Sequence, residues 1–224
     1  MRKINILGIR LKDYTLRESL KKVDEYMKNG ALHTIAYISS QMLVTADENA
    51  AQKEWIESMD MTICAEVDIL YTEEGVSKNR VREIEENAFM TELLRKIARE
   101  KRKIYLIAET KEQLVTLQRE LLEMQNNLQV VGCAVLSPED NVDNFINEVN
   151  DLVPNVIFSR ISSPRQEQLI YENKKKINAG IWVALLEGNV VHNRRQKARK
   201  QLIRYVYKKL FHKKVADYRS REEE

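Results

Sequence analysis

The chain has 224 residues, of which 43% are hydrophobic and 32% are charged, as in soluble globular proteins with a substantial core. It contains only six glycines and three prolines, so it has little linker, and neither of the phosphate-binding patterns GxGxxG and GxxxxGKS/T occurs. The formal net charge is +3, but residues 194–214 hold ten Lys/Arg and no Asp/Glu, which leaves 3 − 10 = −7 for the remainder. A basic segment on an acidic body favours an anionic partner for that segment.

The amino-terminal residues contain no apolar region of the signal-peptide kind, and no stretch approaches the roughly 18 apolar residues of a membrane span. We therefore expect a cytoplasmic protein that does not cross a membrane. Cys64 and Cys133 end apolar runs far apart in the sequence, which favours buried free thiols over a disulfide or a zinc site. His33, His192 and His212 are too scattered to suggest a metal site or a triad. The pattern predicts no metal and no cofactor.

Strand-like and helical periodicities alternate along the chain. In chain order they predict a strand at 4–11, a helix at 15–30, a strand at 33–38, a helix beginning at 39–40, a helix around Trp55, a strand at 61–64, a short helix at 67–71, a helix at 87–100, a strand at 104–107, a helix at 110–124, a strand at 128–133, a helix at 137–151, a strand at 155–158, a helix at 163–176, a strand at 180–186 and a helix from 192 onward. The polar stretch 73–86 is predicted to be a mobile loop.

Strands that alternate with helices form right-handed βαβ units. The predicted fold class is therefore α/β, with a mostly parallel sheet flanked by helices and a basic helical appendage at the C-terminus. The α/β domain is predicted at 1–190 and the appendage at 191–224. In such folds ligands bind beyond the carboxyl ends of the strands. The residues expected on that rim are Ser39, Ser40, Ala65, Glu66, Ala108, Glu109, Ala134 and 162–167.

The hexapeptide 162–167, Ser-Ser-Pro-Arg-Gln-Glu, is the most site-like stretch of the chain. It joins an apolar run to a helical segment, and the unpaired backbone N–H groups of a helix start can hold a phosphate. Ser163, with Gln166 three residues later, also fits a capping box, and Pro164 suits a first helical turn. From the local pattern two interpretations stay open: a structural cap, or a cap that also binds a ligand.

Three stretches carry a resemblance to a known family: Ile-x-Ile-Leu-Gly-Ile from Ile4 followed by Tyr-Thr-Leu-x-Glu-Ser from Tyr14, Asp-Met-Thr-Ile at 60–63, and the hexapeptide 162–167. They are similar to the opening, the Ala-Asp-Leu-Val strand and the Gly-x-Pro-Lys-Gln-Glu signature of the TagA/WecG/CpsF glycosyltransferases of bacterial cell-envelope polysaccharide synthesis. By element order the resemblance covers roughly residues 4–190.

The resemblance implies a TagA-like glycosyltransferase fold and the transfer of an N-acetylhexosamine from a UDP-sugar to an undecaprenyl-diphosphate-linked acceptor. It further implies a metal-independent, inverting reaction and a C-terminal appendage that reaches the membrane. The residues that we expect to bind substrate are Ser39, Ser163, Arg165, Gln166 and Glu167.

The chain departs from the family pattern at several positions. The aspartate of the family's Pro-Asp-Gly motif, thought to be the general base, falls on Ala65, which cannot take a proton, and the adjacent Glu66 is the candidate substitute. Family glycines fall on Ala108, Glu109, Ala184 and Leu185, where a Cβ would crowd a diphosphate. Two hypotheses follow: an active transferase that uses Glu66 or another carboxylate, or a catalytically inactive homologue that binds or scaffolds an active glycosyltransferase. Either a homo-oligomer or a partner enzyme fits the second.

The C-terminal segment has apolar residues at helical spacing with Lys/Arg opposite them. One interpretation is a helix that packs its apolar stripe (202, 203, 206, 210 and 211) on the body and leaves a solvated basic face. The other is an interfacial helix on the anionic inner face of the cell membrane, and nucleic acid is the competing anion. The resemblance favours the membrane. The residues expected to contact it are Arg204, Lys208, Lys209, Phe211, Lys213 and Lys214.

Overall fold

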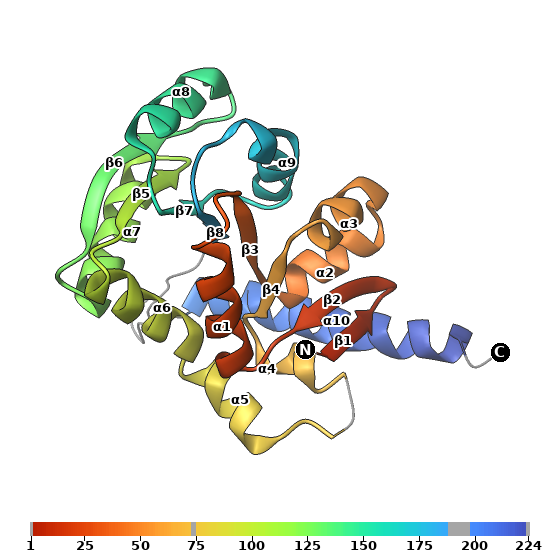
Figure 1. Cartoon of the computed structure of the whole chain (residues 1–224). Helices are drawn as coiled ribbons and strands as arrows, with labels where there is room; N and C mark the ends of the chain where they lie inside the picture. The colour runs from red at the N-terminus through yellow and green to blue at the C-terminus, as the bar shows by residue number, and fades with distance from the viewer. Residues whose placement is uncertain (1, 73–74, 188–197, 223–224) are drawn as a thin grey trace.

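A computed structural model describes residues 2–72, 75–187 and 198–222, with the side chains of the last helix described from 206 to 221. A six-stranded sheet lies between two layers of helices, next to a two-stranded hairpin (Figure 1). The strand order is β4-β3-β8-β7-β5-β6, and every pairing within this sheet is parallel. The predicted α/β class with a parallel sheet flanked by helices is confirmed.

The strands of the hairpin and the main sheet are β1 (Arg2–Ile6), β2 (Ile9–Asp13), β3 (His33–Ile38), β4 (Met61–Cys64), β5 (Lys103–Ala108), β6 (Gln129–Val135), β7 (Val156–Arg160) and β8 (Ile181–Ala184). The helices are α1 (Leu16–Tyr26), α2 (Ser40–Asp47), α3 (Ala50–Glu57), α4 (Val67–Leu70), α5 (Lys78–Glu85), α6 (Ala88–Arg99), α7 (Lys111–Met124), α8 (Val142–Leu152), α9 (Arg165–Asn173), the 3-10 turn η1 (Lys174–Lys176) and α10 (Ala198–Glu222).

The sheet is apolar on both faces, so its strands read as continuous apolar runs. On β5, Tyr105 and Ile107 face α2, α3, α8, α9 and α10, whereas Ile104 and Leu106 face α1, α6 and α7. Successive side chains of a strand point to opposite faces, and all four of these are fully buried. The core therefore lies in two layers, one on each side of the sheet.

The single strand predicted at 4–11 is wrong, because the segment is the hairpin β1–β2. Leu7 and Gly8 both have positive φ, 52° and 71°, and they form a two-residue turn of the kind that joins antiparallel strands. Ile6 pairs with Ile9 across it. The apolar alternation continues through the turn, so the pattern hides where the chain reverses.

The mobile loop predicted at 73–86 is also wrong over most of its length. Residues 73 and 74 lie outside the described residues, and α5 begins at Lys78 with Ser77 as its side-chain cap. Arg80 Nη2 lies 2.7 Å from Asp13 Oδ1 and Arg80 Nη1 lies 2.9 Å from Glu83 Oε2. In α5, Ile84 is the one buried residue. A helix anchored by ion pairs and one apolar side chain shows little apolar periodicity.

The helix predicted at 137–151 begins later, at Val142, where the Asn141 side chain accepts a hydrogen bond from Asp143 N. Before it, Ser137 N donates to Asp140 Oδ2 at 2.6 Å and closes a turn. The Ser-Pro-Glu-Asp pattern thus forms a side-chain-closed turn, which competes with a helix cap for the same residues.

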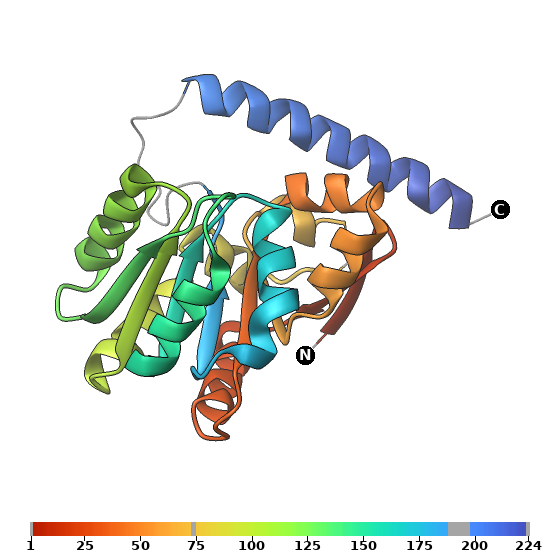
Figure 2. The same cartoon turned by 90° about the horizontal axis from the view of Figure 1, so that it is seen from above.

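The helix predicted from 192 onward is present as α10, while 188–197 lie outside the described residues. Figure 2 shows α10 lying across the helical layer that contains α2. Within the described ranges, no helix combines the length and apolar character needed to cross a bilayer.

Candidate functional site

The parallel sheet gathers the predicted rim residues at one edge. Ser39 follows β3, Glu66 follows β4, Glu109 follows β5, and the hexapeptide 162–167 follows β7. Because all six strands point the same way, their carboxyl ends meet at this edge, where α/β proteins bind ligands. The predicted gathering is confirmed.

The Glu66 side chain is hydrogen-bonded to the first residue of α2, Ser40. Its Oε2 accepts a hydrogen bond from Ser40 Oγ and another, at 3.3 Å, from Ser40 N. Ser39 is the N-cap of the same helix, and its Oγ accepts from Met42 N at 3.2 Å. A carboxylate at a helix N-terminus is stabilised by the helix dipole. Both side chains therefore have a structural partner at the first turn of α2.

The capping box predicted from Ser163 and Gln166 is wrong. The N-cap of α9 is Pro164, and the helix start has no side-chain cap. Ser163 Oγ instead accepts a hydrogen bond from Gln52 Nε2 at 2.9 Å and donates one to Glu167 Oε2 at 2.7 Å. Gln52 lies on α3, so this contact ties α3 to the start of α9. Nothing in the local sequence around the hexapeptide indicates Gln52.

Gln166 is buried in a hydrogen-bond chain. Its Oε1 accepts from Ser159 Oγ at 2.8 Å and from Ile161 N at 3.2 Å, and its Nε2 donates to Leu185 O at 2.9 Å. Trp182 Nε1 donates to Ser159 Oγ at 2.9 Å. The amide thus fastens the loop after β7 to the end of β8.

Arg165 holds the neighbouring loops. Its guanidinium donates to Glu109 Oε1 at 3.0 Å, to Leu136 O at 2.8 Å and to Ser137 O at 2.6 Å. Ser162 Oγ donates to Glu109 Oε2 at 2.5 Å. Partial burial alone would raise the pKa of Glu109, but the hydrogen bonds from Ser162 and Arg165 outweigh it and hold that pKa below its ordinary value. Glu109 is therefore a carboxylate that neutralises Arg165.

Glu167 is the exception among the rim carboxylates, because it is almost wholly buried, with 1% of its surface exposed. The pKa of its carboxyl is raised to about 7. Burial is the main cause and the charge of Glu187 adds to it, whereas the hydrogen bonds from Ser163 and Gln52 oppose the rise. A carboxyl with a pKa close to 7 can both give and take a proton near neutral pH.

The model of the WecG/TagA/CpsF glycosyltransferase family matches residues 4–186, which is most of the 224-residue chain. The chain belongs to this family. No curated protein matches it. The match extends through the hairpin, the whole parallel sheet and the hexapeptide 162–167, and it ends between β8 and α10.

Within this family fold, Ala65 directly follows β4, and its N–H donates to Ile38 O at 2.9 Å. Ala65 has no group that can take a proton, as the sequence indicates. Within residues 2–72, 75–187 and 198–222, no group of three or more His, Cys, Asp or Glu is placed to hold a metal ion.

The predicted membrane-contact residues divide between two faces of α10. Phe211 is fully buried against the body, Lys208 Nζ lies 2.8 Å from Asp68 Oδ2, and Lys214 Nζ lies 2.8 Å from Asp47 Oδ2. Phe211 and Lys214 face the protein, whereas Lys208 reaches Asp68 with 50% of its side chain exposed. Lys209 and Lys213 are exposed, and the side chain of Arg204 lies outside the described ones.

The apolar stripe predicted for this helix also divides. The side chains that pack on the body are Tyr207, Phe211, Val215 and Tyr218. Val206 and Leu210 point outward, with 57% and 39% of their surface exposed, and the side chains at 202 and 203 lie outside the described ones. The outer face, defined here as Val206, Lys209, Leu210 and Lys213, is therefore apolar and basic.

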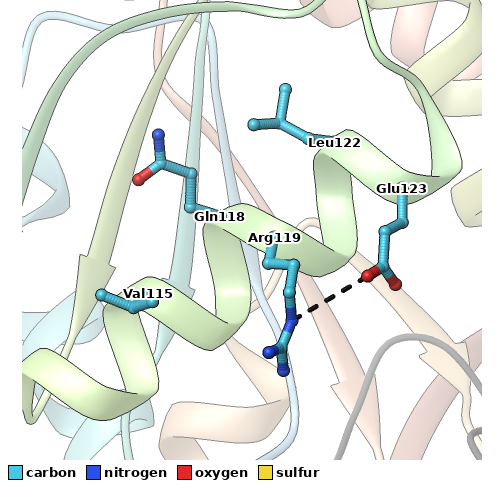
Figure 3. Close-up of a pocket in the computed structure, with 5 residues that line it drawn as sticks. All are labelled: Val115, Gln118, Arg119, Leu122 and Glu123. Carbon is cyan, nitrogen blue, oxygen red and sulfur yellow. Dashed lines mark ion pairs between the residues drawn. The ribbon is translucent and has the colours of Figure 1, made fainter.

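One hollow of the surface lies on α7 (Figure 3). It is lined by Val115, Gln118, Arg119, Leu122 and Glu123. Arg119 Nε lies 3.9 Å from Glu123 Oε1. None of the residues predicted to bind substrate lines it, so it forms no part of the candidate site.

Proposed function

We propose that this protein transfers an N-acetylhexosamine from a UDP-sugar to an undecaprenyl-diphosphate-linked acceptor at the inner face of the cell membrane. The observation that carries the proposal is the gathering of Ser39, Glu66, Glu109 and the hexapeptide 162–167 at one edge of the sheet in a chain of this family. Ligands of α/β proteins bind at this edge. Protonatable carboxyls and hydroxyls there suit a reaction in which an acceptor hydroxyl loses its proton.

The outer face of α10 supports the membrane part of the proposal. Val206 and Leu210 are exposed next to Lys209 and Lys213. Apolar side chains beside lysines suit a helix that lies on an anionic leaflet, where each Lys or Arg near the surface contributes about 1 kcal/mol. An acceptor carried on a lipid would meet the protein at such a surface.

A second candidate function is a catalytically inactive homologue that scaffolds an active glycosyltransferase, as a homo-oligomer or with a partner enzyme. The observations that favour it are Ala65 after β4 and the internal hydrogen bonds of Arg165 and Gln166. Groups already bound within the chain must exchange these bonds for ligand contacts, which lowers the net gain from binding.

Calorimetry and a transfer assay decide between the two. Purified protein is titrated with UDP and with UDP-N-acetylhexosamines, and the transfer of sugar to a lipid-linked acceptor is then measured. The first proposal expects binding heat and turnover. Binding without turnover favours the scaffold, and the absence of both contradicts the transferase.

A further inference from the structure

The hydroxyl of Ser163 has one hydrogen-bonding position left over. A serine hydroxyl offers one hydrogen and two lone pairs. Ser163 gives its hydrogen to Glu167 Oε2 at 2.7 Å and uses one lone pair for Gln52 Nε2 at 2.9 Å. The residue itself is exposed at the rim. Its second lone pair can therefore accept a hydrogen bond from a hydroxyl group that arrives from outside.

Glu167 lies behind that hydroxyl as a proton acceptor shielded from water. It is buried in the first turn of α9, and Ser163 lies between it and the surface. The charge that raises its pKa, on Glu187, is also negative, so it favours uptake of a proton. A proton that reaches Ser163 Oγ can thus be passed inward to a group suited to hold it near neutral pH.

Glu66 is less suited to this role. Its Oε2 accepts two hydrogen bonds from Ser40 at the start of α2, and Ser40 is buried, so these bonds lead to no exposed hydroxyl. Arg165 likewise neutralises Glu109. Of the three serines that donate to Glu66, Glu109 and Glu167, Ser40 is buried, Ser162 is half-buried and Ser163, which donates to Glu167, is exposed.

We infer that Ser163 and Glu167 form the proton relay of the transfer reaction, with Gln52 as the residue that positions Ser163. This inference rests on the proposed glycosyl transfer. The acceptor oxygen forms a bond to the anomeric carbon, and the bond from that carbon to the UDP oxygen breaks, its electron pair leaving with UDP. The acceptor proton moves to Ser163 Oγ while the proton of Ser163 moves to Glu167 Oε2. The relay replaces the base that is missing at Ala65.

The test compares Glu167→Gln and Ser163→Ala with wild type in the transfer assay, with Glu172→Gln as a matched control on the exposed face of α9. The relay predicts that each of the first two variants loses about 100- to 10,000-fold in kcat, whereas UDP binding measured by calorimetry stays within about twofold. Ser163→Thr, which keeps the hydroxyl, is expected to retain most of the activity. Glu172→Gln is expected to match wild type.

A pH profile separates a proton relay from a structural role. Wild-type kcat/KM should rise with pH through about 7, where Glu167 loses its proton, and this limb should vanish in Glu167→Gln. Wild-type turnover in Ser163→Ala overturns the relay and leaves the transferase standing. Loss of activity in Glu66→Gln with full activity in Glu167→Gln assigns the base to Glu66. Wild-type protein that shows no turnover contradicts the proposed function itself, and the relay with it.

Discussion

Glu167 also links the pH to the stability of the fold. Its folded pKa is about 7, above the 4.5 of an unperturbed glutamate, so the folded state holds a proton that the unfolded state has released between these values. Its contribution to stability is full below pH 4.5 and is lost as the pH rises through 7. A shift of this size corresponds to about 3 kcal/mol.

We therefore predict that Glu167→Gln, which stays neutral, becomes more stable relative to wild type by up to about 3 kcal/mol as the pH rises from 4.5 to 7.5. Urea unfolding at a series of pH values measures the difference. Parallel stability curves for the two proteins would show that Glu167 does not take up this proton.

Arg160 on β7 and Glu120 on α7 form an ion pair that is almost wholly buried. Arg160 Nη2 lies 2.7 Å from Glu120 Oε2, and their side chains are 2% and 5% exposed. Arg160→Met leaves the carboxylate buried without its arginine, and we predict a loss of about 3–5 kcal/mol in the free energy of unfolding. The double change Arg160→Met with Glu120→Leu should recover most of it. A single variant as stable as wild type in urea would contradict this assignment.

At the scale of single residues, the sequence predicted what depends on near neighbours. The helices predicted from 15 and from 39–40 begin at the N-caps Thr15 and Ser39, whose side chains accept hydrogen bonds from backbone N–H groups three residues later. The partner of Ser163 is Gln52, which lies 111 positions away. Tertiary packing brings Gln52 next to Ser163, and the bonds of Ser163 with Gln52 and Glu167 replace the capping box that the local pattern predicted.

At the scale of elements, α10 is attached to the body mainly through Phe211. This side chain is fully buried, whereas Val206 on the same helix is 57% exposed. The ion pairs of Lys214 with Asp47 and Glu48 involve partly exposed side chains and contribute little. Apolar burial therefore dominates the attachment of the helix.

We predict that Phe211→Ala weakens this attachment by about 3 kcal/mol or more, while Val206→Ala changes stability by no more than about 0.5 kcal/mol. Hydrogen exchange measures the effect, because a local opening that costs 3 kcal/mol less raises the exchange of the α10 amides about a hundredfold. Equal exchange rates in the two variants would show that Phe211 does not hold the helix.

Elements with a strong apolar period were predictable, and those held by other forces were not. The strands of the main sheet follow from buried apolar runs. The helix α5 is held by the ion pairs of Arg80 with Asp13 and Glu83. The pair with Asp13 spans 67 positions, and ion pairs give a sequence no apolar period. The sequence did not predict the hairpin, because the chain reverses direction at Leu7 and Gly8 while the alternation of apolar and polar residues continues.

At the scale of the whole molecule, the α/β fold class follows from the alternation of strands and helices along the sequence, but the order of the strands in the sheet does not. Because parallel strands all end at one edge of the sheet, the sequence was enough to predict that the rim residues lie at that edge. It did not say which carboxylate would be buried, because that depends on how α3 packs against α9. The family resemblance and the parallel sheet are confirmed. The hydrogen bonds of Ser163 with Gln52 and Glu167 join α3 to the start of α9.

The outer face of α10 gives the last prediction, on binding to membranes. Its apolar members Val206 and Leu210 would enter the lipid boundary, and Lys209 and Lys213 would meet anionic headgroups. We expect the protein to pellet with anionic liposomes and not with neutral ones, and Val206→Asp with Leu210→Asp to abolish the pelleting. At about 1 M salt the Debye length falls to about 3 Å, so binding should weaken.

Val115→Asp provides the matched control for this experiment. Val115 is an exposed valine on α7, 64% accessible, so the change places a negative charge on a different helix. If pelleting depends on the outer face of α10, this variant should bind as wild type does. Equal loss in both would show that net charge alone governs binding. Tight binding to duplex nucleic acid without binding to liposomes would assign the basic helix to a different anion, because a basic helix with aromatic residues suits both.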